Sequence, residues 1–437
     1  MKFEIKPYTL VLLVGPIRSG KSDFAHKLLQ QFLAQDEALT GSILSVAALS
    51  KEVCGRPDLD AYDPLLDEAE EPAMDLLRAK LDAYMAPMTG QHLVIVDSLG
   101  LNEHFRKEMA QLARIKRYQS LAVVFDYDKM VFLQASAEEP IRRRIGTQAK
   151  AIKSKVLPRI RREGFHEVVR LHQPTDFTSE LALRDVFERT RLDLPTGARF
   201  AVVGDVHEQA DALDRLTSFI PMDVQLIQLG DYLDKNGNTA QVIDVMERLV
   251  AHRGMIVLHG NHENYVAARL TGQLEASEAD EHFSSLAALQ ADKTLANRFL
   301  ALWRQSRPFL RVAQPGRRTV WITHAPCAPE VLGKLTTFDL RDQRNLRIPG
   351  RTDVETLQVL APLLQSAHTQ GPWRVFGHIA HSGPARRFNQ IWLDTGAAHA
   401  GGKLSAVIFD SATPQFVDVP VSSGISDARL SFEDFKS

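Results

Sequence analysis

Short apolar runs alternate with longer amphipathic stretches through the first half of the chain. The runs cover residues 8–14, 41–47, 92–97 and 121–126, and polar turns flank each of them. Strands that are buried on both faces of a sheet have this continuous apolar character. The stretches between them, such as AMDLLRAKLDAYM, repeat apolar residues at helical spacing. The pattern predicts βαβ units and therefore a parallel sheet.

Strand-like runs return after residue 199, and each of them ends in a polar motif. The runs are ARFAVV, VQLIQL, MIVLH, RTVWI and WRVF. A long helical pattern, Tyr265–Arg307, interrupts the series, and we expect it to be an insertion over the polar motifs. Between the two halves, Pro195 and Gly197 mark a change of pattern within Arg191–Arg199.

The pattern thus predicts an α/β chain of two domains. We expect residues 1–195 to form the first domain and residues 196–420 the second. Residues 421–437 have weak periodicity and form a C-terminal tail. A length of 437 residues agrees with two domains, because single hydrophobic cores rarely extend so far.

Composition narrows the class of protein further. The formal net charge of −2 argues against a chain that coats nucleic acid non-specifically. Two distant cysteines, Cys54 and Cys327, exclude a disulfide framework and fit a reducing compartment. No apolar run approaches the roughly 20 residues of a membrane helix. We therefore expect a cytoplasmic protein that does not bind a membrane. The sequence is also compatible with a homo-oligomer.

The first polar motif, GPIRSGKS, matches the Walker A pattern between a predicted strand and a predicted helix. Its backbone N–H groups converge on phosphate oxygens at a helix N-terminus. Lys21 would reach the β- and γ-phosphates, and the Ser22 hydroxyl would bind Mg²⁺. Asp97, at the end of LVIVD, is placed to order that Mg²⁺. The sequence predicts ATP or GTP binding with Mg²⁺ by Gly15, Arg18, Ser19, Gly20, Lys21, Ser22 and Asp97.

Five motifs in the second half carry oxygen and nitrogen donors. They are GDVH, GDYLD, GNHE, THA and GHI, and each follows a predicted strand. The donors therefore project from the carboxyl ends of strands, where open α/β sheets place their sites. Two divalent ions about 3.5–4 Å apart clamp a phosphate and supply the nucleophile. Carboxylate and imidazole ligands suit Mn²⁺, Fe or Zn²⁺ better than a soft thiolate metal.

We assign the donors to two ions that share one carboxylate. Asp231 bridges both ions; Asp205 and His207 complete the first set, and Asn261, His324 and His378 complete the second. His262 is then free to act as general acid on the leaving oxygen, and Asp234 is placed to orient it. No metal-ligand motif surrounds His381, His259 or His399. We expect His381 to contact the ligand residues and not the metal.

These motifs resemble those of the calcineurin-like metallophosphoesterases over about Arg199–Asp418. GDYLDK, HGNHE and FGHIAH look like the branch that contains protein Ser/Thr phosphatases and diadenosine-tetraphosphate hydrolases. That branch usually continues its second motif with Asp-Arg-Gly, whose arginine contacts the substrate phosphate. Lys235 stands there in this chain, and it keeps the charge without the bidentate fork of arginine.

A Walker A domain ahead of such a phosphatase resembles bacterial polynucleotide kinase–phosphatases. The resemblance implies a P-loop NTPase parallel sheet followed by a metallophosphoesterase α/β sandwich. It also implies phosphorylation of 5′-OH ends and removal of 3′-phosphate or 2′,3′-cyclic phosphate from RNA or DNA ends. Arg142 and Arg143, within RRR, fall where the family's lid arginines contact nucleotide phosphates. A basic stretch from 142 to 162 fits such a lid, a polynucleotide track or a solvated helical face.

The family places a general-base aspartate after the second strand and an arginine three residues later. Ala47 and Ser50 occupy these positions, and Glu52 or Asp58 could replace the base only with a different loop shape. We expect nucleotide binding without efficient transfer. The alternative is a protein Ser/Thr phosphatase or dinucleoside-polyphosphate hydrolase in which the P-loop domain is a nucleotide sensor. A third reading is a nucleotide-gated binding module with little phosphatase turnover.

Overall fold

The computed structural model divides into two compact units, one containing strands β1–β5 and the other strands β6–β16. Each unit is described by itself. The predicted tail, 421–437, lies outside the described residues except for Val421. The structure describes residues 5–35, 39–59, 63, 65–87, 90–128, 139–173, 189–335, 337–346, 371–410 and 413–421.

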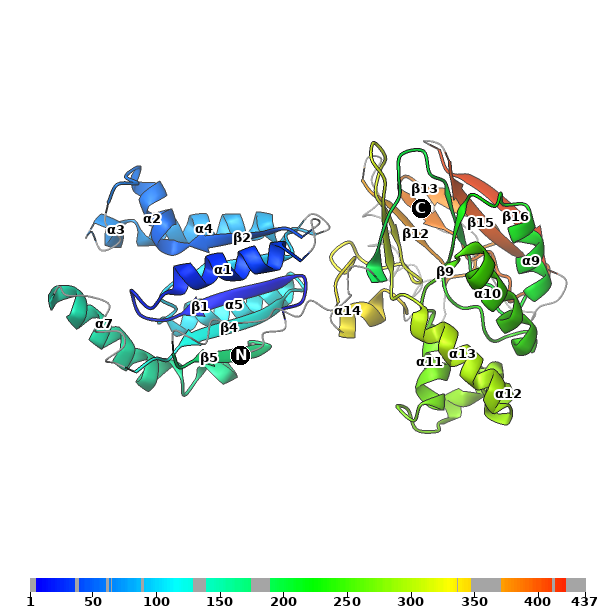
Figure 1. Cartoon of the computed structure of the whole chain (residues 1–437), viewed down its shortest axis with the longest axis horizontal. Helices are drawn as coiled ribbons and strands as arrows, with labels where there is room; N and C mark the ends of the chain where they lie inside the picture. Colours follow the sequence, from blue (N-terminus) through cyan, green and yellow to red (C-terminus); the bar gives the residue numbers. More distant parts are fainter. Residues whose placement is uncertain are drawn as a thin grey trace. The chain divides into compact units, whose positions relative to one another are not determined.

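The first unit contains a five-stranded, all-parallel sheet in the order β2-β3-β1-β4-β5 (Figure 1). Every predicted apolar run of the first half forms a strand of this sheet. The second run ends earlier than its apolar pattern, because Ser45 caps a helix that starts at Val46. The strands are β1 (Thr9–Val14), β2 (Gly41–Ser45), β3 (Leu93–Asp97), β4 (Gln119–Phe125) and β5 (Glu167–Leu171).

Helices cover this sheet and bury its apolar residues. Helices α4 and α5 share a core with Leu10, Leu12 and Val14 of β1, whereas α1 contacts β2 and β3. A π-helix (Ile152–Val156) and a short 3₁₀ turn (Ile160–Arg162) continue the last helix toward β5. The helices are α1 (Lys21–Leu33), α2 (Val46–Cys54), α3 (Leu65–Glu68), α4 (Glu70–Tyr84), α5 (Glu103–Ile115) and α7 (Glu139–Ala151).

The second unit packs two mixed sheets against each other. One sheet has the order β13-β14-β12-β11-β10-β6 and the other β16-β15-β7-β8-β9. Arg191–Asp193 (β6) pairs with β10, so the segment predicted to separate the domains starts with an edge strand of this unit. The other strands are β7 (Phe200–Val203), β8 (Gln225–Gln228), β9 (Ile256–Val257), β10 (Leu310–Ala313), β11 (Val320–Ile322), β12 (Trp373–Phe376), β13 (Ala385–Arg387), β14 (Gln390–Trp392), β15 (Lys403–Phe409) and β16 (Gln415–Pro420).

Two cores hold the second unit together. One lies between the sheets and contains residues such as Val202, Ile322 and Val375. The other lies between the second sheet and its helices, and Ala201, Leu226 and Phe299 belong to it. The predicted insertion, Tyr265–Arg307, contains the second part of α11 and all of α12 and α13. The helices are α9 (Ala210–Ser218), α10 (Thr239–Arg253), α11 (Asn261–Leu270), α12 (Ser284–Ala291), α13 (Lys293–Gln305) and α14 (Thr337–Asp342), with a 3₁₀ turn at Glu278–His282.

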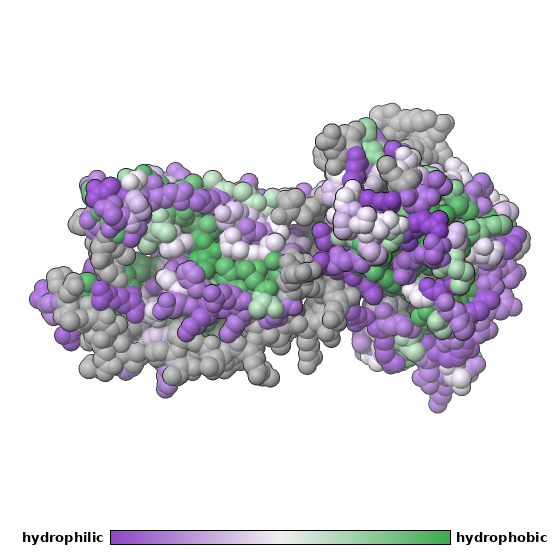
Figure 2. Space-filling model, turned by 45° about the horizontal axis from the view of Figure 1, so that its top comes forward, coloured by the Kyte–Doolittle hydropathy of each residue, from purple (hydrophilic) through white to green (hydrophobic). Residues whose placement is uncertain are grey.

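Hydrophilic residues predominate on the visible face of the second unit, whereas hydrophobic residues form a green area on the visible face of the first unit (Figure 2). Within the described ranges, no helix combines the length and the apolar character that crossing a membrane requires. Neither Cys54 nor Cys327 is in a disulfide in the described part of the chain. The mixed α/β architecture, with a parallel sheet first, is the one that the apolar pattern predicts.

Candidate active site

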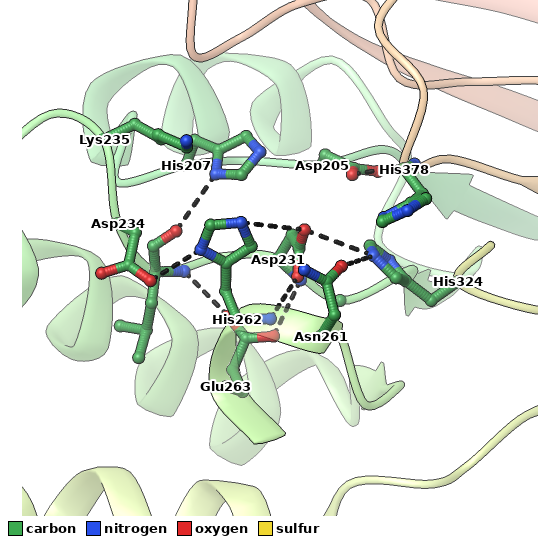
Figure 3. A network of polar contacts seen from close by, with 12 residues as sticks. Asp205, His207, Asp231, Asp234, Lys235, Asn261, His262, Glu263, His324 and His378 are labelled. Carbon is green, nitrogen blue, oxygen red and sulfur yellow. Dashed lines mark hydrogen bonds and ion pairs between the residues drawn. The ribbon is translucent and has the colours of Figure 1, made fainter. Parts of the chain in front are cut away.

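The polar motifs of the second unit meet at one end of the sheets, directly after their strands. Two groups of donor atoms form there, one from Asp205, His207 and Asp231, and the other from Asp231, His324 and His378. Within each group the donor atoms lie within 4.8 Å of one another, and Asp231 belongs to both (Figure 3). This is the sharing of one carboxylate that the motif order predicts.

Glycines before the donors allow this close approach. A Cβ atom on Gly377 would lie 1.9 Å from Asp205 Oδ1, and one on Gly260 would lie 2.2 Å from Asp231 Oδ1. Side chains at these positions would collide with the carboxylates. The donor loops also contain strained backbone, because Asp231 (φ 53°) and His378 (φ 71°) adopt left-handed conformations. Such strain is typical of functional sites.

Backbone carbonyls orient two of the imidazoles. Leu233 O lies 3.1 Å from His207 Nδ1, and Leu229 O lies 3.1 Å from His324 Nδ1. An Nδ1–H that donates to a carbonyl leaves Nε2 with a lone pair for a metal ion. Asn261 Oδ1 lies 2.9 Å from His324 Nε2, so the amide oxygen stands beside the second donor group.

Burial keeps the donor imidazoles of His207 and His378 uncharged. It lowers the pKa of His207 to about 3, with the neighbouring His262 adding to the effect. It lowers the pKa of His378 to about 4, with His324 acting in the same direction. A neutral imidazole is the form that binds a metal ion.

The two carboxylates respond to this environment in opposite ways. Burial raises the pKa of Asp205 well above its usual range, and the negative charges of Asp394 and Asp231 add to the rise. Burial would also raise the pKa of Asp231, but the imidazoles of His324 and His262 outweigh it and lower that pKa. Asp205 Oδ1 is buried without a hydrogen-bond partner among the described residues.

This donor set fits divalent ions. Carboxylate, imidazole and amide donors converge in two groups, and crowded buried carboxylates need a cation to compensate their charge. The lone pairs of the buried Asp205 Oδ1, which has no hydrogen-bond partner among the described residues, and the neutral imidazoles provide the ligand atoms. The residues therefore suit the hard or borderline metals predicted from the sequence, such as Mn²⁺, Fe or Zn²⁺.

His262 lies beside the donor groups and has a partner of its own. Its Nδ1 is 2.7 Å from Asp234 Oδ2, and its Nε2 is 3.8 Å from Asp231 Oδ2. Burial alone would lower the pKa of His262, but the charges of Asp231 and Asp234 raise it. The predicted insertion contacts this pair, since Ser285 N donates to Asp234 and the Phe283 ring packs 5.1 Å from the His262 ring.

Two buried glutamates support the donor loops, and the sequence analysis did not single them out. Glu263 accepts hydrogen bonds from the backbone N–H groups of Asp231 (2.8 Å) and Leu233 (2.9 Å). Glu208, at φ 62°, accepts from the N–H of Asn236 (3.1 Å) and from neighbouring donors in the next loop. Both directly follow a histidine of a predicted motif, in GNHE and GDVHE. This position is the feature of the sequence that could have indicated them.

The Walker A segment of the first unit forms the turn expected between β1 and α1. Gly20 stands before α1 with φ 80°, and Ser22 Oγ donates to Asp97 Oδ2 at 2.7 Å. Lys21 Nζ donates to the carbonyls of Gly15 (3.0 Å) and Pro16 (2.6 Å). Burial lowers the pKa of Lys21 to about 8, although the charge of Asp97 acts in the opposite direction.

A cleft of about 990 Å³ opens from this turn. Arg18, Ser19, Gly20, Lys21, Ser22 and Asp97 all line it. From α7, Arg144 and Gln148 reach the cleft, and Gln148 Oε1 accepts from Ile17 N at 2.9 Å.

Arg142 and Arg143 are exposed on α7, and Arg143 pairs with Glu139 at 3.3 Å. Neither is among the described residues that line the cleft. Their contact with nucleotide phosphates therefore stays a prediction.

Ala47 and Ser50 line the cleft at the start of α2. The Ser50 hydroxyl donates to Val46 O of its own helix at 3.1 Å. Glu52 pairs with Lys80 and Asp58 with Arg56, each at 2.9 Å, and neither acid is among the described lining residues.

Two residues outside these sites have structural contacts. Arg106, in the helix after Asp97, is buried and pairs with Glu163 at 2.6 Å. His259 Nε2 lies 2.9 Å from Ser306 O, and burial lowers the pKa of His259 to about 4. That His259 is not a ligand stays a prediction.

Fold and site together define a metallophosphatase domain joined to a P-loop domain. The profile of the calcineurin-like phosphoesterases matches residues 198–395, and that of the chromatin associated protein KTI12, a P-loop kinase-like family, matches residues 8–170. Residues 198–395 are therefore a calcineurin-like metallophosphoesterase domain, and the chain is a phosphoesterase hydrolase with an N-terminal P-loop kinase-like domain. No curated protein matches the chain.

Solved structures resemble each part of the chain at a distance. A protein serine/threonine phosphatase from Saccharomyces cerevisiae is 11% identical, covering 56% of this chain and 87% of its own at a TM-score of 0.34. A metallophosphoesterase from Sphaerobacter thermophilus is 15% identical, with 51% and 89% coverage and a TM-score of 0.33. A chain of the PezAT toxin–antitoxin system of Streptococcus pneumoniae is 13% identical, with 39% and 69% coverage and a TM-score of 0.28. TM-scores this low carry no functional argument.

Proposed function

We propose that the protein removes phosphate from 3′-phosphate or 2′,3′-cyclic phosphate ends of RNA or DNA at a dinuclear metal centre in the second unit. The observation that carries the hydrolytic part is the pair of donor groups that share Asp231. The resemblance to polynucleotide kinase–phosphatases supports nucleic acid ends as the substrate. The P-loop domain before the phosphoesterase domain has the order of that family.

Two divalent ions would supply the Lewis acid that polarises the phosphate ester. Asp231 would be shared by both ions. Asp205 and His207 would complete the first set of ligands, and Asn261, His324 and His378 would complete the second. The neutral imidazoles and the buried carboxylates suit this role without further deprotonation at His207 and His378.

His262 would act as the general acid. Its Nδ1–H donates to Asp234, which leaves Nε2–H of the imidazolium to protonate the leaving oxygen. The carboxylates of Asp231 and Asp234 keep His262 protonated to higher pH than an isolated histidine. Asp234 itself is held by Ser285, so the imidazole has one preferred orientation.

We infer that the first unit binds ATP or GTP with Mg²⁺ but transfers phosphate poorly. The turn, Lys21 and the Ser22–Asp97 pair support nucleotide binding. Ala47 offers no base to an acceptor hydroxyl.

Four acids, here called the carboxylate wall, also line the cleft: Glu70, Glu71, Asp75 and Glu108. Arg78 lines it as well and pairs with Asp75 at 2.9 Å and with Glu108 at 2.6 Å. The carboxylates of Glu70 and Glu71 would repel the phosphates of a polynucleotide acceptor.

A substrate panel tests the proposal. Oligonucleotides ending in 3′-phosphate or 2′,3′-cyclic phosphate, a phosphopeptide and diadenosine tetraphosphate would each be incubated with Mn²⁺ and the wild type, Asp231→Asn or Lys21→Ala. We expect release of phosphate from the oligonucleotides by the wild type and Lys21→Ala but not by Asp231→Asn. Hydrolysis of only the phosphopeptide or the dinucleotide would overturn the nucleic-acid assignment.

The second candidate is a protein phosphatase or dinucleoside-polyphosphate hydrolase with a nucleotide-sensing P-loop domain. The missing base at Ala47 favours it, since a sensor needs to bind a nucleotide without using it. This candidate requires that ATP changes the hydrolytic rate of the wild type and not that of Lys21→Ala.

A further inference from the structure

A second cleft, of about 600 Å³, lies in the phosphoesterase unit away from the candidate metal centre. Phe200, Val320 and Trp373 line it, and they are the first residues of β7, β11 and β12. The candidate ligands follow the opposite, carboxyl ends of these strands. Because a strand rises about 3.3 Å per residue, Trp373 and His378 stand roughly 15 Å apart along the chain. The cleft is therefore a site of its own.

Aromatic rings from both sheets form its floor. Phe200 stacks on Phe409 with 4.6 Å between ring centroids and 9° between ring planes. Trp373 meets Phe409 edge to face, with centroids 6.3 Å apart. All three side chains are largely buried, so the floor is held in place by the core between the sheets.

Three exposed arginines surround this floor. Arg317 and Arg318 come from the turn between β10 and β11, and Arg386 comes from β13. The guanidinium groups of Arg318 and Arg386 lie 5.6 Å and 5.2 Å from the centroid of the Trp373 ring. No carboxylate is among the described residues that line the cleft. In a chain with a net charge of −2, this is a local concentration of positive charge.

Phe388 also lines the rim of this cleft, and its backbone conformation and exposed ring are both unfavourable for folding. It lies in the turn between β13 and β14 with φ 49°, a region that bulky side chains rarely adopt. Its side chain is 51% exposed. A glycine or asparagine would form this turn with less strain, so the aromatic ring points to a binding role.

We propose that this cleft binds single-stranded nucleic acid. A base would stack on the exposed ring of Phe388, and phosphates would bind Arg317, Arg318 and Arg386 above the buried aromatic floor. Sequence-independent single-strand binding uses this combination of stacking and positive charge. Stacked guanidinium groups keep their N–H edges available for phosphate. The inference concerns a site other than the metal centre and holds whatever that centre hydrolyses.

Binding without hydrolysis tests the proposal. Fluorescence anisotropy would follow an end-labelled single-stranded RNA of about 10 nucleotides, with EDTA present to prevent turnover. We expect Arg318→Glu and Arg386→Glu each to weaken binding at least tenfold and Phe388→Ala to weaken it about 5- to 50-fold. Each arginine variant should also reduce the slope of log affinity against log salt by about 0.7.

Arg304→Glu is the matched control, since this exposed arginine on α13 is not among the residues that line the cleft. It should bind the RNA as the wild type does. Unchanged melting temperatures would show that the variants fold. Wild-type affinity in both Arg318→Glu and Arg386→Glu, or binding of free AMP with no binding of the RNA, would overturn the proposal. Loss of hydrolysis in Asp231→Asn with RNA binding intact would separate this site from the metal centre.

Discussion

His262 Nδ1 lies 2.7 Å from Asp234 Oδ2, and Asp234 in turn accepts a hydrogen bond from Ser285 N at 2.8 Å. The chain Ser285–Asp234–His262 connects α12 to the candidate general acid. It fixes the imidazole orientation, and the two carboxylates beside the ring raise its pKa. The role of His262 therefore depends on a residue that need not touch the substrate.

Asp234→Asn should lower kcat and move the alkaline limit of activity to lower pH. Asp234 helps to raise the pKa of His262, so loss of its charge lets the imidazolium lose its proton at lower pH. The pH profile of kcat on a substrate with a poor leaving group measures this shift. His262→Ala should cost about 10²- to 10⁴-fold on that substrate and less on p-nitrophenyl phosphate, which needs little protonation. An unshifted alkaline limb in Asp234→Asn would contradict the orienting role.

Removal of metal should make stability depend on pH. Burial and the charge of Asp231 raise the pKa of Glu263 to about 7, above its value in an unfolded chain. Its neutral form therefore stabilises the fold at low pH, and this contribution is lost as the pH rises from about 4.5 to about 7. Asp205, whose pKa is also raised, acts in the same direction. The buried histidines His207, His378 and His259, whose pKa values are lowered, act in the opposite direction. Thermal melts with EDTA should therefore be read against Glu263→Gln, and the wild type should lose melting temperature relative to this variant over the interval.

With Mn²⁺ the difference between the wild type and Glu263→Gln should be smaller, because bound cations compensate the carboxylates. A difference in melting temperature between the two proteins with EDTA that stays constant between pH 5 and 7 would contradict the assignment of Glu263 as a buried acid of raised pKa.

Gly377→Ala should abolish metal binding. The new Cβ would lie 1.9 Å from Asp205 Oδ1, so either the loop or the carboxylate must move. Gly383→Ala is the control, since a Cβ there meets nothing within 4 Å. Metal content after dialysis, with the melting temperature, measures the effect. Equal metal content in the two variants would exclude a close packing requirement at Gly377.

Lys235→Ala should raise KM for phosphate esters about tenfold with a smaller change in kcat. The Lys235 charge lowers the pKa of both His207 and His262, so it acts at the site. Figure 3 shows Lys235 beside His207. Lys235→Arg should retain a low KM, because arginine keeps the charge and adds a fork for phosphate. A KM unchanged in Lys235→Ala would mean that this lysine does not meet the substrate phosphate.

Ala47→Asp should add phosphoryl transfer if the first unit lacks only a base. Ala47 lines the P-loop cleft in the first turn of α2, where a carboxylate suits the helix dipole. Transfer of labelled phosphate from ATP to a 5′-OH oligonucleotide measures the gain, and the wild type should show little. Ala47→Asp combined with Lys21→Ala should show none. No gain in Ala47→Asp would mean that the carboxylate wall also prevents acceptor binding.

The local sequence was sufficient for the parallel sheet and for the donor motifs. Continuous apolar runs identify doubly buried strands, and a glycine followed by a donor marks the end of a strand. For that reason the sequence alone predicts Asp205, Asp231 and His324 at the edge formed by the carboxyl ends of the strands. The Walker A turn could also be predicted from the sequence, because its glycines and Lys21 are neighbours in the chain.

Only the tertiary structure decided which distant groups meet. The buried glutamates Glu208 and Glu263 act through backbone N–H groups that loop conformation brings to them. The sequence places each glutamate directly after a motif histidine but does not show which N–H groups it meets. Arg144 rather than Arg142 or Arg143 lines the P-loop cleft because a helix turns neighbouring side chains about 100° apart. The basic and aromatic cleft joins Phe200 and Trp373, from strands of two sheets, with Arg318 from the turn between β10 and β11, and only sheet packing brings them together.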